Sequence, residues 1–223
     1  MTASATTDRL TLGRMQNPVR GLMNAAAALA SLVGTLCLWS RGASFSRQLP
    51  LLIFGGSLLG LYTVSALYHS VPWRAVWKGR MQRLDHSMIY VVVAGTYTPV
   101  VGLMLSGWRR SGILAVVWGI AAVGIAQKVL LPQIGGGLSI VLQMVQGWIG
   151  PFVAHPLAQT MPGEALVLMA FGGLLYTAGL IMFVTQRPRL WPRVFSYHEV
   201  FHVFVVAASI VHYATIFTFV AAA

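Results

Sequence analysis

The stretch of sequence that decides the fold is SYHEVFHVFVVAASIVHYATIFTFV, which spans residues 196–220. From residue 203 to residue 220 it contains no ionisable side chain of the Asp, Glu, Lys, Arg or His type except His212. A helix needs about 20 mainly apolar residues to cross the hydrocarbon core of a bilayer. The stretch therefore predicts a membrane-spanning helix, with His198 and His202 near the end where that helix meets water. Ionisable side chains at such a depth usually have a functional role.

The rest of the chain repeats this apolar pattern. Of its 223 residues, 57% are hydrophobic and 9% are charged, whereas about a quarter of the residues in a soluble domain are charged. Apolar runs predict seven helices, over residues 21–39, 49–69, 84–105, 112–131, 138–157, 165–184 and from 197 almost to the end. We expect an all-α fold, a polytopic seven-transmembrane-helix bundle. It would have a polar N-terminal tail at residues 1–20 and a single membrane domain at residues 21–223.

The basic residues predict how the bundle is oriented. The net charge of +11 would suit a nucleic-acid partner, but the Lys and Arg residues lie in short loops between apolar runs, which favours a membrane protein. The odd-numbered loops carry only Arg41, Arg47, Arg109 and Arg110. The N-terminus and the even-numbered loops carry the others, which are Arg9, Arg14, Arg20, Arg74, Lys78, Arg80, Arg83, Lys128, Arg187, Arg189 and Arg193. Because cytoplasmic loops are enriched in basic residues, we predict a cytoplasmic N-terminus and a C-terminus outside.

This orientation brings several polar side chains to one membrane depth. His198 and His202 are four residues apart, so they lie on one helix face, one turn apart. His69 ends the second predicted helix and Asp85 begins the third, on the same side of the membrane. Ser65 precedes His69 by one turn. The sequence therefore predicts that three histidines and a carboxylate converge from three helices.

Three neutral imidazoles suit Zn²⁺ and leave a fourth position for water, as in catalytic rather than structural zinc sites. Such a metal lowers the pKa of its water to about 7, and Asp85 could orient that water or take its proton. Ser65 would hydrogen-bond beside it as an orienting or oxyanion-stabilising group. The remaining histidines lie on another face or at another depth and are assigned no metal role: His86, His155 and His212.

Each of these residues also has a purely structural interpretation. Asp85 could cap the third helix, because aspartate is favoured at that position. His69 could be an interfacial histidine bonded to a carbonyl, and Ser65 could pack between helices. The His198 and His202 pair alone could arise by chance. The agreement of all of them in depth favours a metal site over these separate explanations.

Four segments resemble the signature segments of bacterial hemolysin III proteins, the prokaryotic relatives of the progestin and adipoQ receptors. They are SALYH from Ser65, RLDHSMIY from Arg83, AGTYTP from Ala94 and HEVFH from His198. The resemblance implies a seven-helix protein of the plasma membrane. It also implies a zinc ion held by His69, His198 and His202, with Ser65 and Asp85 beside the metal.

One region departs from the pattern of that family. Many bacterial members carry a glutamate and a histidine in the first helix, where this chain offers Asn24 and neither of the others. We therefore expect the first helix to have little role in the site, while the three histidines remain intact.

The wider superfamily of this resemblance includes alkaline ceramidases, which implies zinc-dependent hydrolysis of a lipid amide such as ceramide. Other functions stay open, because some members act as receptors and the bacterial branch is named for haemolysis. The segment from His198 to His202 also matches the His-Glu-x-x-His pattern of zincins, in which Glu199 would be the general base of an intramembrane metalloprotease. A channel or transporter is disfavoured, because no stripe of charged residues crosses the apolar runs.

Overall fold

The computed structural model describes residues 11–12, 15–131, 133–134, 136–191 and 194–222. Within these residues, seven helical spans are long and apolar enough to cross a membrane, which confirms the predicted fold class. The helices are α1 (Pro18–Arg41), α2 (Phe45–Ser70), α3 (Ala75–Met104), α4 (Gly107–Leu130), α5 (Gly136–Gly147), α6 (Gly150–Leu157), α7 (Gly163–Thr185) and α8 (Tyr197–Thr215). α5 and α6 form the fifth span, and α8 continues through the π-helical turn η1 (Ile216–Val220) as the seventh.

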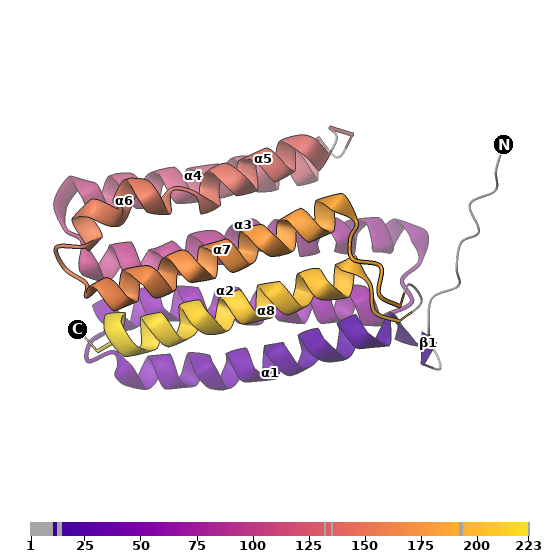
Figure 1. Ribbon diagram of the computed structural model, residues 1–223, viewed down its shortest axis with the longest axis horizontal. Helices are drawn as coiled ribbons and strands as arrows, with labels where there is room; N and C mark the ends of the chain where they lie inside the picture. The colour runs from indigo at the N-terminus through magenta and orange to yellow at the C-terminus, as the bar shows by residue number, and fades with distance from the viewer. Residues whose placement is uncertain (1–10, 13–14, 132, 135, 192–193, 223) are drawn as a thin grey trace.

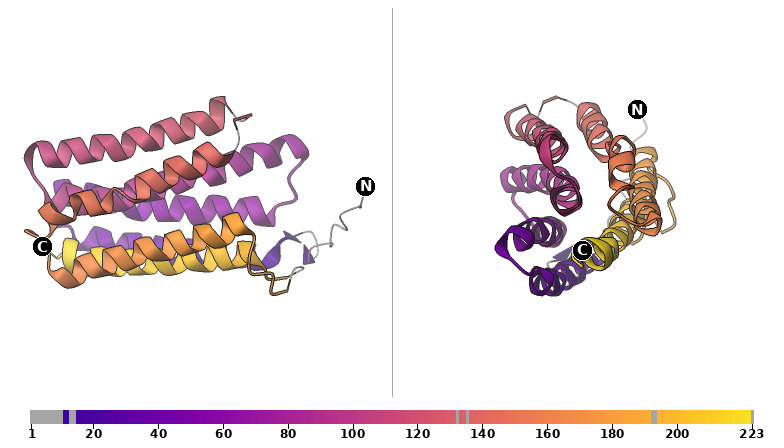
Figure 2. Two further views of the ribbon diagram at one scale, coloured as in Figure 1. Left: turned by 45° about the horizontal axis from the view of Figure 1, so that its top comes forward. Right: turned by 90° about the vertical axis from the view of Figure 1, so that its left-hand side faces the viewer.

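The spans follow one another around the bundle, with their axes roughly along its length (Figure 1). α1, α2, α3 and α4 pack in sequence order, α5 lies against α4, and α7 packs on α8. The last span returns beside the first, so that α8 contacts α1 (Figure 2). Residues that are distant in sequence, at the two ends of the chain, are therefore neighbours in the folded protein.

The predicted N-terminal tail falls mostly on residues 1–10 and 13–14, which lie outside the described residues, as does Arg193. A hairpin of β1 (Thr11–Leu12) and β2 (Met15–Gln16) precedes α1. α1 itself begins at Pro18, so Arg20 belongs to the first helix and not to a loose tail. The division into tail and membrane domain, and the orientation of the termini, stay predictions.

α3 begins nine residues earlier than the apolar pattern predicted, at Ala75 instead of residue 84. Its first turns contain Lys78, Arg80 and Arg83, which favour helix but interrupt an apolar run. Asp85 consequently lies about three turns inside the helix, and Arg74 occupies the N-cap position. The structure therefore excludes the interpretation of Asp85 as a helix cap.

The fifth span is broken between Gly147 and Gly150, a feature that the hydropathy pattern did not predict. Pro151 has no backbone N–H, so it cannot donate to the carbonyl four residues earlier, which belongs to Gly147. The Tyr97 hydroxyl of α3 donates to that carbonyl at 2.9 Å. The break is thus stabilised by a neighbouring helix, as membrane helices require for a freed backbone group.

Small residues let α7 and α8 approach closely. A Cβ atom added to Gly172 would lie 2.6 Å from His212 Nε2, and one added to Gly179 would lie 2.9 Å from Phe204 Cβ. His212 Nδ1 is 3.4 Å from Met169 Sδ of α7, and the His212 ring stacks on Tyr176 of the same helix. His212 therefore connects two helices in the core of the bundle, away from the other histidines of α8.

Candidate metal centre

A helix cap positions the histidine pair of α8. Ser196 and Glu199 form a capping box, in which the Ser196 backbone N–H donates to Glu199 Oε2 at 2.8 Å. This arrangement satisfies backbone donors that the first helical turn leaves without partners. Because α8 begins immediately after Ser196, the His198 and His202 side chains leave the helix within its first two turns.

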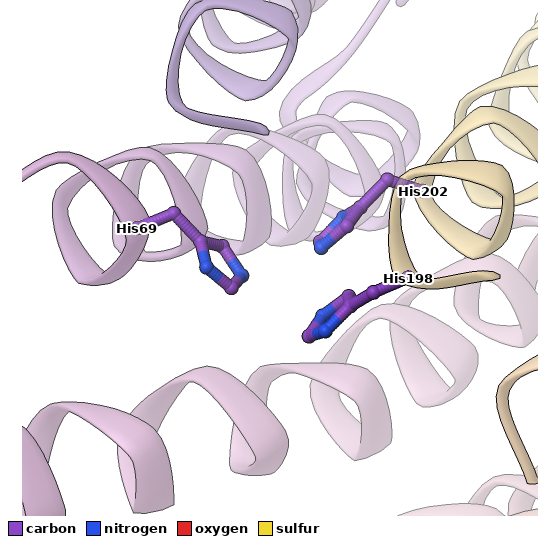
Figure 3. A group of neighbouring side chains, drawn as sticks. All are labelled: His69, His198 and His202. Carbon is purple, nitrogen blue, oxygen red and sulfur yellow. The ribbon is translucent and has the colours of Figure 1, made fainter. Parts of the chain in front are cut away.

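The structure brings the His69 imidazole of α2 against the His198 and His202 imidazoles of α8. One nitrogen from each ring lies within 4.8 Å of the other two. The His198 and His202 rings are parallel, with centroids 5.0 Å apart, and His69 stands at 87° and 90° to them. All three rings point into the space between the two helices (Figure 3).

This geometry fits a divalent metal. Tetrahedral coordination at Zn–N distances of about 2.0–2.1 Å puts ligand nitrogens about 3.3 Å apart, which modest side-chain rotations would reach from the observed spacing. His69 and His202 are buried, and His202 Nε2 has no hydrogen-bond partner among the described residues. A buried nitrogen without a partner is costly, and a metal would remove that cost.

Asp85 of α3 lies beside Ser65 of α2, which precedes His69 of the cluster by one helical turn. Both are buried, at 8% and 2% exposure, and the Ser65 side chain lies next to the Asp85 carboxyl group. The Ser65 hydroxyl has no hydrogen-bond partner of good geometry within the described part of the chain. Asp85 is not one of the three clustered ligands. Its position suits a group that acts on a molecule near the metal, and not a metal ligand.

Arg20 of α1, which the sequence pattern placed in the N-terminal tail, also belongs to this region. Its side chain is 5% exposed, and its Nε lies 2.6 Å from Glu199 Oε1 in a buried ion pair. The other oxygen of Glu199 accepts the Ser196 backbone N–H. Both carboxylate oxygens of Glu199 are therefore committed to structural contacts, which disfavours Glu199 as the general base of a zincin.

Asn24, one turn after Arg20, is a second contribution of α1. Its Nδ2 donates to the Arg20 carbonyl at 2.8 Å and lies 3.4 Å from His202 Nδ1. The amide nitrogen can only donate, so His202 Nδ1 is the acceptor in this contact. A His202 that binds a metal through Nε2 would instead carry its proton on Nδ1 and donate it to an outer acceptor, and the Asn24 amide oxygen, which has no other partner among the described residues, is available for that role. We expected the first helix to have little role in the site, and the contacts of Arg20 with Glu199 and of Asn24 with His202 differ from that expectation. The signal was the spacing of Arg20 and Asn24, two polar residues on one face of an apolar helix.

The other histidines lie elsewhere, as expected. His155 is exposed near the end of α6, at the opposite end of the bundle from His69. His212 lies ten residues beyond His202, or about 15 Å along a helix. His86 adjoins Asp85 but is outside the three-histidine cluster.

The chain is similar to proteins of a known membrane-protein family. Residues 14–213 match the sequence profile of the family described as Haemolysin-III related. The Hemolysin-3 homolog of Bacillus subtilis (strain 168) is 34% identical over 157 residues, which cover 70% of each chain. Hemolysin-3 of Bacillus cereus is 30% identical over 193 residues, 86% of this chain and 85% of the relative. The human Monocyte to macrophage differentiation factor is 25% identical over 196 residues, 85% of this chain and 78% of that protein.

Proposed function

The chain belongs to the Haemolysin-III related family, and on that premise we propose that it is a zinc-dependent hydrolase of lipid amides in the plasma membrane. The observation that carries the proposal is the cluster of His69, His198 and His202, whose nitrogens lie within 4.8 Å of one another. Three neutral nitrogen donors with room for a fourth ligand are typical of catalytic zinc. The site lies near the ends of two membrane-spanning helices, where a lipid can reach it without leaving the bilayer.

The residues have separate roles in this proposal. His69, His198 and His202 would hold the zinc ion, which when bound supplies a Lewis acid and lowers the pKa of water. Asp85 orients the attacking water and accepts its proton as a general base. The Ser65 hydroxyl donates a hydrogen bond to the oxygen on which negative charge develops. Burial of both side chains keeps them in an environment of low dielectric, which strengthens these interactions.

The contacts of Glu199 favour a lipid-amide hydrolase over the metalloprotease alternative. A zincin needs the glutamate carboxylate to be available to water. Here one oxygen pairs with Arg20 and the other caps α8. Among the described residues, structural contacts do not hold both carboxylate oxygens of Asp85. Asp85 is therefore the better candidate for the general base.

The experiment that tests the proposal measures zinc content and hydrolysis on the same preparations. Wild type, His202→Ala, Asp85→Ala and the control His155→Ala are purified without chelator, analysed for zinc and assayed against ceramides and other acyl amides and esters. We expect one zinc per chain in every variant except His202→Ala, and turnover only in wild type and His155→Ala. If wild type binds zinc but hydrolyses nothing in the panel, the metal has only a structural role and holds α2 and α8 together.

A further inference from the structure

The first turns of α3 carry a basic surface that projects past the neighbouring helices. α3 has 30 residues, so it is about 45 Å long, while the hydrocarbon core of a bilayer is about 30 Å thick. Figure 1 shows the N-terminal end of α3 extending beyond the ends of α2 and α8. Arg74 and Lys78 in this extension are exposed, and neither forms an ion pair with another described residue.

Lys78 lies in line with the aspartate of the metal centre. It precedes Asp85 by seven residues, which places the two within about 20° on the helix circumference and about 10 Å apart along the axis. Arg74 precedes the helix by one residue, and its carbonyl accepts the Lys78 N–H at 2.8 Å, so it lies one turn further out. Arg80 and Arg83 point to the opposite side of α3, and Arg80 lies over the Trp77 ring.

The charge of this extension has no acidic counterpart in the part of the protein that the structure describes. The acidic residues described are Asp85, Glu164 and Glu199. Asp85 is buried, Glu199 pairs with Arg20, and Glu164 is at the other end of the bundle. Trp73 and Trp77 flank the two cations, and tryptophan is enriched at the depth of lipid headgroups. Exposed cations beside interfacial tryptophans fit the phosphate of an anionic lipid.

The spacing matches the layout of such a lipid. In a bilayer, the phosphate lies at the water interface and the carbonyl linkages of the acyl chains lie just beneath it. The α-carbons of Lys78 and Arg74 lie about two and three helical turns outward of Asp85, or about 10–16 Å, so a phosphate that both side chains bind leaves the acyl linkage near the depth of Asp85 and His69 only if those side chains extend inward along α3. Lysine and arginine side chains are long enough to cover the remaining distance.

We propose that Arg74 and Lys78 bind the phosphate of an anionic lipid headgroup and deliver that lipid to the metal centre. The docking stands on the charge and position of α3 alone. The delivery rests on the proposed hydrolase function, and it names the substrate class as a phosphate-bearing lipid amide instead of a neutral ceramide. The headgroup sets the depth of the lipid, while Ser65 and Asp85 act on the acyl linkage.

Binding is tested without any measurement of activity. Wild type, Arg74→Ala/Lys78→Ala and the matched control Arg109→Ala/Arg110→Ala are placed in phosphatidylcholine nanodiscs with a small fraction of phosphatidylglycerol. The control removes two exposed cations from the other end of the bundle. The phosphatidylglycerol that stays with the protein on extraction is counted by native mass spectrometry. Because each basic residue near an anionic lipid contributes about a fivefold preference, we expect retention to fall between five- and 25-fold in the first variant only.

Two further arms sharpen this result. Arg74→Lys/Lys78→Arg should restore retention, and soluble glycerol phosphate at millimolar concentration should not displace the lipid, since it lacks the acyl chains. Equal retention in the two alanine pairs would overturn the proposal, as would retention of phosphatidylcholine that equals retention of phosphatidylglycerol.

The link to hydrolysis has its own measurement. Wild type should hydrolyse ceramide 1-phosphate in preference to ceramide, and Arg74→Ala/Lys78→Ala should raise the KM for the phosphorylated lipid while leaving kcat and the KM for ceramide unchanged. A preference for neutral ceramide that is the same in wild type and variant would overturn the delivery. If no lipid is hydrolysed but the retention difference is present, the hydrolase function fails and the docking surface remains.

Discussion

The two ends of the bundle contain similar residue types, but only one end buries them. At one end His69 and Glu199 are 3% and 4% exposed, and both have polar neighbours: His69 lies against His198 and His202, and Glu199 pairs with Arg20. At the other end His155 and Glu164 are both exposed. Burying ionisable groups is costly unless they are paired or bind a metal. The difference shows that burial with specific partners, and not the presence of histidine or glutamate, marks the candidate site.

The largest effect concerns which end faces the cytoplasm. The distribution of loop Lys and Arg predicts that the buried cluster lies at the cytoplasmic end. An alkaline phosphatase reporter fused after residue 223 should be active and a fluorescent protein that folds only in the cytoplasm should be dark. If the phosphatase is inactive and the fluorescent protein is bright, the C-terminus is cytoplasmic and the metal centre lies at the outer end of the bundle.

Removing a cluster histidine should cost nearly all of the zinc. We expect His69→Ala, His198→Ala and His202→Ala each to lower zinc affinity by more than about 100-fold, beyond the effect of an outer-layer residue. The measurement is competition with a chromogenic chelator, with His155→Ala as the control. Equal affinity in all four variants would show that the two ends do not differ in metal binding.

Removing the buried carboxylate should cost turnover but not zinc. Asp85→Asn keeps the size of the side chain and removes its basicity, so hydrolysis should fall about 10²- to 10⁴-fold. Zinc content should stay at one per chain. Glu164→Gln, at the exposed end, should change neither quantity. An Asp85→Asn protein with wild-type turnover would remove Asp85 from the chemistry.

Breaking the buried ion pair should destabilise the protein strongly. Arg20→Met removes one partner of a buried ion pair with the Glu199 carboxylate, and such changes cost about 3–5 kcal/mol. The double variant Arg20→Met/Glu199→Gln removes both charges and should recover most of that loss, measured as thermal unfolding in detergent. Retained lipid hydrolysis in the double variant would also exclude Glu199 as a general base. Arg109→Ala, at the exposed end, should stay within about 0.5 kcal/mol of wild type.

The smallest effect is expected from the outer hydrogen bond of α1. Asn24→Ala should lower zinc affinity about 10- to 100-fold, because Asn24 contacts the outer nitrogen of His202. Asn24→Asp should restore most of the affinity, since a carboxylate can accept the Nδ1 proton that a metal-bound His202 carries. Ser31→Ala serves as the control, because the Ser31 hydroxyl donates within α1, to the Ala27 carbonyl. A Co²⁺ spectrum that is identical in Asn24→Ala and wild type would show that Asn24 does not orient the ligand.

The sequence was sufficient for features that depend on local composition. Apolar length predicted the seven spans, and the depth argument predicted that His69 would lie near His198. The start of α3 was missed because Lys78 and its neighbours break the apolar run without breaking the helix. The break before Gly150 was missed because Pro151 lies inside an apolar run that looks continuous, and the carbonyl that it frees is satisfied by the hydroxyl of Tyr97, a residue of another helix.

The spacing of Arg20 and Asn24 marks a polar face of α1, but the partner of that face could not be read from any local pattern. Arg20 and Glu199 are 179 residues apart in the chain and meet only in the folded bundle. On its own, Arg20 looks like one more basic residue flanking a membrane span, which is the most common role of arginine at that position. Only the three-dimensional arrangement shows that its charge is buried and paired.

The ion pair between Arg20 and Glu199 also has a consequence for biosynthesis. It joins the first membrane span to the last, so one partner is made at the start of translation and the other near its end. The first span must wait in the membrane with its arginine at the interface until the last span arrives, because a lone buried cation is unfavourable. The metal centre can therefore assemble only on a chain whose insertion is complete. A product truncated before residue 196 should carry no ordered site, which would make metal loading a checkpoint for full-length protein.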